Sequence, residues 1–111
     1  MTPRPVREIE LIGRTHKIKV PAGTLYIVIN KKEGKYHQVL INVSQTGSFL
    51  TPICEALGRM ITLSLRFGAS LEDCAKQLEG IKGSEPIWFE GEQVLSISDG
   101  VAKVLRRELK L

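Results

Sequence analysis

Three stretches near the start of the chain have residue patterns that are typical of β-strands. In residues 15–20, Ile18 and Val20 alternate with Lys17 and Lys19, which puts the apolar groups on one face of a half-buried strand. Residues 24–30 and 36–43 are rich in β-branched and apolar residues. The charged segment 31–35 between them contains Gly34, which favours a hairpin turn. The pattern predicts a three-stranded antiparallel meander.

The period then changes to that of a long helix over residues 49–67. Its apolar residues form two neighbouring stripes: Leu50, Ile53, Cys54, Leu57, Met60, Ile61 and Leu65 in one, and Phe49, Ala56, Leu63 and Phe67 in the other. Together they span roughly 200°, about twice the arc that one core face needs. Thr51 followed by Pro52, or else Ser48, is expected to cap the helix, and Gly68 to end it. Because so short a chain has little material to cover two faces, we expect self-association, as a homodimer or a larger assembly, through helix 49–67.

The remaining residues predict a second helix, a hairpin and a third helix. The second helix is expected over residues 70–80 and the hairpin over residues 86–97, with a turn at Gly91. Ser98 or Asp99 is expected to cap the last helix. The order β-β-β-α-α-β-β-α is that of an α+β domain.

Length and composition indicate a single globular domain. The chain has 111 residues, of which 42% are hydrophobic and 25% charged, with a net charge of +4. We expect residues 1–13 to form an N-terminal arm and residues 14–111 to form the domain. No apolar run approaches the ~20 residues needed to cross a bilayer. Cys54 and Cys74 show no CxxC spacing, so a cytoplasmic protein without metal or cofactor is expected.

Candidate binding chemistry gathers at the start of the long helix. The loop Thr46-Gly47-Ser48 leaves backbone N–H groups beside the positive end of the helix dipole, a setting suited to a phosphate or carboxylate. Arg59 and Arg66, seven residues apart on one helix face, would add guanidinium groups. The alternative is an ordinary capped turn in which Arg59 pairs with Glu55 one helical turn away.

Two other classes of function stay open. A small enzyme would use His16 or His37 with Asp99 as acid–base groups, although no nucleophile motif accompanies them. A nucleic-acid-binding module would use basic side chains of the first three strands and their turn, which equally protect a sheet from aggregation. These side chains are Lys17, Lys19, Lys31, Lys32 and Lys35.

Several segments, taken together, resemble the TSCPD domain. They are Gly23–Asn30, Val39–Val43, Gln45–Ser48, Glu55-Ala56-Leu57-Gly58-Arg59 and Gln77–Lys82. The resemblance covers roughly residues 12–109. TSCPD domains occur in the C-terminal region of adenosylcobalamin-dependent (class II) ribonucleotide reductases and as small free-standing proteins. The resemblance implies an α+β module that accompanies a reductase, without the radical-bearing barrel of the reductase itself.

The chain departs from the TSCPD pattern at its cysteines. Gly83 and Ile97 stand where the family usually carries cysteines, and only Ser96 and Asp99 remain of the Thr-Ser-Cys-Pro-Asp signature. Neither glycine nor isoleucine supplies a thiolate, so no metal or redox role is expected here. Gln45 also replaces a lysine that is common in the family's loop, which weakens an inherited phosphate site.

The sequence thus predicts a non-catalytic TSCPD-like module associated with ribonucleotide reduction, which binds a reductase partner or a nucleotide-like anion. The anion would be held by Thr46, Gly47, Ser48, Arg59 and Arg66. The alternatives are a phage-type protein that sequesters a nucleotide signal and a basic nucleic-acid-binding module. No membrane association is expected.

Overall fold

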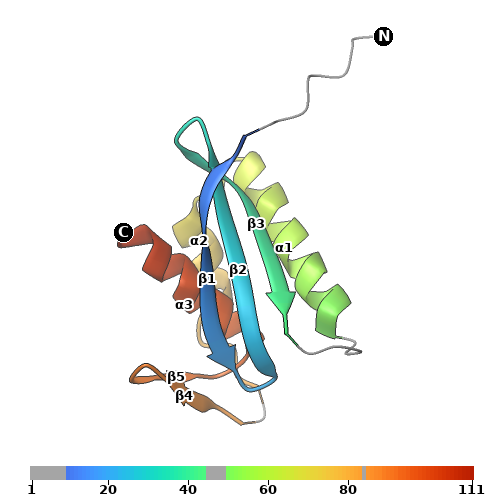
Figure 1. Cartoon of the computed structure of the whole chain (residues 1–111), viewed down its shortest axis with the longest axis vertical. Coiled ribbons are helices and arrows are strands. Elements are labelled where there is room, and N and C mark those ends of the chain that lie inside the picture. Colours follow the sequence, from blue (N-terminus) through green and yellow to red (C-terminus); the bar gives the residue numbers. More distant parts are fainter. Residues whose placement is uncertain (1–9, 45–49, 84) are drawn as a thin grey trace.

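An antiparallel sheet of three consecutive strands forms one layer of the protein, and helices form the other (Figure 1). The computed structural model describes residues 10–44, 50–83 and 85–111. The strands are β1 (Ile12–Val20), β2 (Gly23–Lys32) and β3 (Lys35–Val43), in that order across the sheet. The predicted meander and the α+β class are confirmed. β1 begins at Ile12, so the sheet takes in the last two residues of the segment assigned to the arm.

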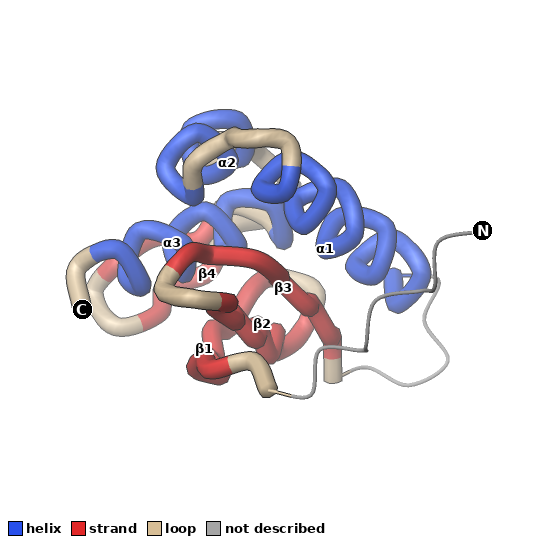
Figure 2. The backbone as a smooth tube through the Cα atoms, turned by 90° about the horizontal axis from the view of Figure 1, so that it is seen from above, coloured by secondary structure: helices blue, strands red, loops and turns tan. Residues whose placement is uncertain are grey.

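The register of the strands separates a buried face of the sheet from an open one. On the buried face, Ile18 lies opposite Leu25, which lies opposite Val43 on the far strand. The apolar sheet residues buried there are Ile18, Val20, Leu25, Ile27, Ile29, Val39 and Ile41. The open face carries Tyr26 and Leu40, which are 40% and 44% exposed. All of the helices lie on the buried side of the sheet (Figure 2).

Three helices cover the sheet in different ways. Helix α1 (Leu50–Arg66) runs along β3 at the edge of the sheet, and α3 (Ile97–Leu109) packs against β1 and β2. Helix α2 (Leu71–Leu78) packs on α3. The hairpin of β4 (Ile87–Phe89) and β5 (Glu92–Val94) lies beside β1. None of the helices described here combines the length and hydropathy that crossing a bilayer requires.

The second helix starts at residue 70 as predicted, with Ser70 as its cap, whereas the cap predicted at Thr51 for α1 is wrong. Ser70 Oγ accepts a hydrogen bond from the Asp73 N–H at 2.9 Å, and the Asp73 carboxylate accepts one from the Ser70 N–H at 2.9 Å, a complete capping box. Helix α1 begins at Leu50, so Thr51 lies inside its first turn and is not the cap. The alternative cap, Ser48, lies outside the described residues.

Helix α3 begins earlier than the sequence predicted. Its cap is Ser96, whose Oγ accepts a hydrogen bond from the Asp99 N–H at 3.1 Å, and not Ser98 or Asp99. The second hairpin strand ends at Val94, three residues before its predicted end. Burial decides the difference, because as part of the helix Ile97 packs against the core.

A buried carboxylate joins the C-terminal end of α3 to the sheet. Glu108, 3% exposed, accepts hydrogen bonds from His16 Nε2 at 2.8 Å, Arg14 at 3.1 Å and the Tyr36 hydroxyl at 3.1 Å. Burial alone would raise the pKa of Glu108. The hydrogen bonds from His16 and Tyr36, with the charge of Arg14, outweigh burial and hold its pKa below the usual value. The ionised carboxylate is therefore part of the folded structure.

The close packing of α3 on the sheet predicts that Gly100→Ala destabilises the protein. A Cβ at this buried position would lie 2.6 Å from Cγ1 of the buried, β-branched Val20. We expect a net loss of about 1–2 kcal/mol, because overpacking outweighs the gain in helix propensity. Urea denaturation measures the loss. Ser98→Ala, at a half-buried position of the same helix, should change stability by less than about 0.5 kcal/mol; equal losses would contradict the prediction.

The buried carboxylate predicts a specific loss of stability in acid. Because the pKa of Glu108 is lowered in the folded state, its contribution is complete above the unfolded pKa of about 4.3 and is lost as the pH falls through the lowered value. Glu108→Gln should cost on the order of 2 kcal/mol at pH 7 and should flatten the acid limb of the stability profile. Urea titrations from pH 7 to pH 3 measure both effects.

The exposed Glu92→Gln is the control for this variant, and its profile should follow that of the wild type. An acid limb in Glu108→Gln as steep as that of the wild type would refute the assignment.

Candidate functional site

A groove between α1 and β3 has a volume of about 540 Å³. Residues 38–42 of β3 form one side of it. The other side is formed by Thr51, Glu55, Gly58, Arg59, Thr62, Leu63 and Arg66 of α1. The groove therefore brings polar, cationic and apolar groups together along a helix and the edge of a sheet.

The groove exists because α1 closes the edge of β3 at two points. The Thr62 hydroxyl accepts a hydrogen bond from the Val39 N–H at 3.0 Å and lies 3.2 Å from the Val39 carbonyl, to which it can donate. Gly58 lets the helix approach, since a Cβ there would lie 3.0 Å from that same carbonyl oxygen. An edge strand exposes unpaired backbone groups that promote association with other strands. Here the Thr62 side chain bonds both backbone groups of Val39.

The structure places both predicted arginines on one side of this groove. Arg59 and Arg66 are two helical turns apart, about 10.5 Å along the axis, and both line the groove. Arg59 also makes the ion pair with Glu55 that was its alternative role, at 2.9 Å, with both side chains largely exposed. Arg66 has no carboxylate within ion-pair distance in the described part of the chain. The loop Thr46-Gly47-Ser48 lies outside the described residues.

The structure does not bring a histidine to Asp99. His16 is 7% exposed and is hydrogen-bonded to Glu108, a residue that the sequence analysis missed. His37 lies on β3, where the register with β2 shifts. The Asp99 carboxylate is bonded to backbone N–H groups. The His–Asp pairing considered for an enzyme is therefore not formed.

The basic side chains of the sheet lie at two separate places. Lys17 pairs with Tyr26 on β2, whereas Lys31 pairs with Ile12 near the opposite end. Five residues of strand, about 17 Å, separate these positions. Lys31 also lies over the Tyr36 ring, 4.7 Å from its centre. The lysines thus do not form one continuous patch for a nucleic-acid backbone.

Cys54 and Cys74 are buried, as their places on apolar helix faces predicted. Burial raises the pKa of both thiols, which keeps them protonated. Within residues 10–44, 50–83 and 85–111, no cluster of three His, Cys, Asp or Glu side chains could hold a metal ion.

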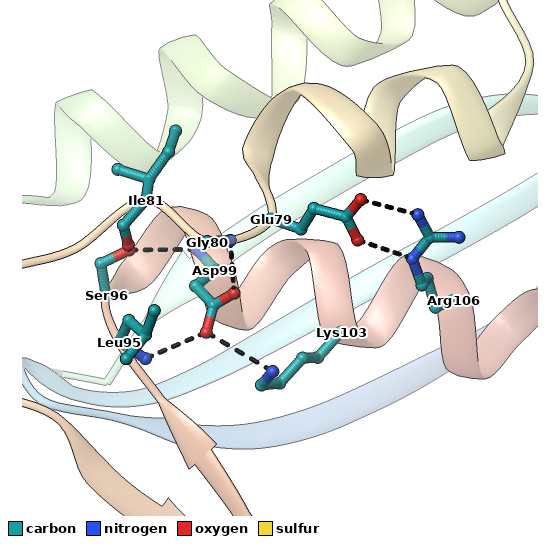
Figure 3. A network of polar contacts seen from close by, with 8 residues as sticks. All are labelled: Glu79, Gly80, Ile81, Leu95, Ser96, Asp99, Lys103 and Arg106. Carbon is teal, nitrogen blue, oxygen red and sulfur yellow. Dashed lines mark hydrogen bonds and ion pairs between the residues drawn. The ribbon is translucent and has the colours of Figure 1, made fainter.

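The two residues kept from the TSCPD signature form a structural centre (Figure 3). The Asp99 carboxylate, 2% exposed, accepts hydrogen bonds from the N–H groups of Gly80 at 2.9 Å and Leu95 at 3.0 Å. Ser96 Oγ donates to the Ile81 carbonyl at 2.6 Å and also caps α3. Lys103 lies 3.5 Å from the Asp99 carboxylate. These contacts fasten the segment after α2 to the start of α3.

Gly83 and Ile97, which stand where the family usually carries cysteines, lie beside this centre. The Gly83 N–H donates a hydrogen bond to the Leu95 carbonyl at 3.0 Å, two residues before Ile97. A Cβ on Gly83 would lie 3.1 Å from that carbonyl oxygen. Backbone hydrogen bonds and the packing of Ile97 on the core thus join these two segments.

Asp99→Asn replaces one of the two accepting carboxylate oxygens by an amide NH₂ group, which cannot accept a hydrogen bond. That group would face a backbone N–H donor, so we predict that the variant destabilises the fold. We expect a loss of about 2 kcal/mol in urea denaturation. Glu79→Gln is the matched control: it disturbs the exposed pair of hydrogen bonds between Glu79 and Arg106, both at 2.9 Å, and should cost less than about 1 kcal/mol. If both variants lose the same stability, the structural role of Asp99 is refuted.

The comparison with protein families agrees with the resemblance read from the sequence. The model of the TSCPD domain matches residues 1–109 of the 111. Comparison with curated proteins and with solved structures finds no match. The chain belongs to the TSCPD domain family.

Proposed function

We propose that this protein is a non-catalytic, cytoplasmic TSCPD module that binds a nucleotide-like anion in the groove between α1 and β3. The observation that carries the proposal is the alignment of Arg59 and Arg66 along a groove of about 540 Å³. Pockets for small molecules and cofactors commonly have volumes of about 300–1,000 Å³. A mononucleotide or dinucleotide is a ligand of suitable size.

The chemistry of the groove fits the parts of a nucleotide. Guanidinium groups bind phosphate oxygens with two parallel hydrogen bonds, and the side chain of Arg66 has no carboxylate partner among the described residues. Leu40 and Leu63 offer apolar surface for a base, and the exposed Asn42 offers an amide for the base edge. The occurrence of TSCPD domains in ribonucleotide reductases supports nucleotides as the ligand class.

The composition of the groove supports binding without catalysis. Its described lining contains neither histidine nor cysteine, and its one carboxylate, Glu55, is paired with Arg59. General acid–base catalysis needs a titratable group within reach of the reacting atoms. A partner reductase would then be served by a module that holds or delivers a nucleotide.

Arg66→Ala is predicted to weaken nucleotide binding about 10-fold or more, since a hydrogen bond to a charged group contributes about 1.5–3 kcal/mol. A thermal-shift panel of mononucleotides, dinucleotides, cyclic dinucleotides and inorganic phosphate identifies the ligand, because a compound bound only by the folded state raises the melting temperature. Calorimetric titration of the wild type and the variant then measures the change.

Lys19→Ala removes one exposed positive charge outside the groove and is the matched control. It should leave nucleotide affinity unchanged. Equal weakening by both variants, or no stabilisation by any compound of the panel, would refute the proposal. Binding of a nucleic acid that falls steeply with salt and is insensitive to Arg66→Ala would favour the nucleic-acid alternative.

A further inference from the structure

Helix α1 has a second apolar face that no described element covers. Its buried residues Cys54, Gly58 and Ile61 face the interior of the protein. The opposite face carries large apolar side chains that are 47% to 86% exposed. The large residues of this face are Ile53, Met60, Leu63 and Phe67, and the small Ala56 lies between Ile53 and Met60. We name these five residues the α1 seam.

The spacing of the α1 seam specifies the kind of element that fits it. Its residues follow one another at intervals of three, four, three and four, which is the a/d pattern of helices that pack side by side. Phe67 continues the line past the last residue of the helix, because its N–H donates to the Leu63 carbonyl at 3.1 Å. The seam therefore runs the whole length of α1 and is shaped for another helix.

We propose that the α1 seam binds the α1 seam of a second copy of this chain. A partner helix must itself expose an apolar stripe of this spacing. The short helix α2 buries Leu71, Cys74 and Ala75, and α3 buries Val101, Val104 and Leu105. Among the described helices, only α1 of another copy offers such a stripe, and a patch that pairs with itself closes as a two-fold dimer.

Two properties of the seam favour a copy of the chain as the occupant. Four of its side chains are large, apolar and 47% to 86% exposed along one line, and contiguous apolar patches on a protein surface commonly mark interaction sites. The seam is bordered by the Glu55–Arg59 ion pair, so each copy presents both signs of charge to the other. Small Ala56 in the middle of the seam allows the two helices to approach closely.

The α1 seam adjoins the groove and shares one residue with it. Leu63 belongs to both the seam and the groove, so association would place a groove on each side of the dimer interface. Failure of nucleotide binding would leave the seam and its partner unchanged, and the two proposals are tested by different measurements.

Light scattering of the full chain tests the proposal. The wild type should have twice the 12.4 kDa mass of one chain at high micromolar concentration. Met60→Glu places a charge in the centre of the seam on both copies and should raise the dimer dissociation constant at least about 100-fold. Met60 is 59% exposed in the single chain, so circular dichroism and the melting curve of the variant should show a folded monomer. Ile53→Glu, 53% exposed, provides a second variant.

Trp88→Glu is the matched control, because it puts the same charge on an apolar side chain that is 71% exposed but lies on β4. It should retain the dimer. A wild type that stays monomeric at high concentration, as expected if a different protein occupies the seam, would overturn the proposal. So would seam variants that keep the mass of the wild type, or a Trp88→Glu variant that dissociates as readily as they do.

Discussion

The architecture depends on the contact between α1 and the edge of β3. Thr62 bonds both backbone groups of Val39, and Gly58 brings the helix backbone within the space that a methyl group would fill. Because the helix lies beside the edge of the sheet, only one of its two apolar faces is buried. The groove and the α1 seam are consequences of this position, since both lie along parts of α1 that no other described element covers.

Two buried carboxylates hold α3, the helix around which the remaining layers pack. Asp99 binds backbone N–H groups near the start of the helix, and Glu108 receives side-chain hydrogen bonds from β1 and β3 near its end. A buried carboxylate is costly unless its oxygens are well bonded, so each one specifies the arrangement of its partners. The helix is thereby fixed relative to both the sheet and the segment that follows α2.

The signature region of this chain is held by backbone hydrogen bonds. Ser96 and Asp99 bond to backbone groups of Gly80, Ile81 and Leu95. Gly83 and Ile97 lie on segments that hydrogen bonds hold together, so this region keeps its shape without thiolates. The candidate binding groove of this chain lies between α1 and β3, away from the signature region.

Local patterns in the sequence determined the elements of this protein, and long-range contacts decided how they are used. The three strands, the start of the second helix at Ser70 and the two apolar stripes of residues 49–67 could be read from the chain, because each depends on neighbours a few residues away. Arg59 and Arg66 could be placed on one helix face for the same reason.

The sequence could not predict that Glu108 would meet His16, or that Asp99 would bond to Gly80 in place of a histidine. Packing alone brings these partners together. The start of α3 at Ile97 was likewise decided by burial against the core, which outweighed the capping preference of Asp99. The groove itself belongs to the tertiary structure alone, because it requires both the edge of β3 and the helix that closes it.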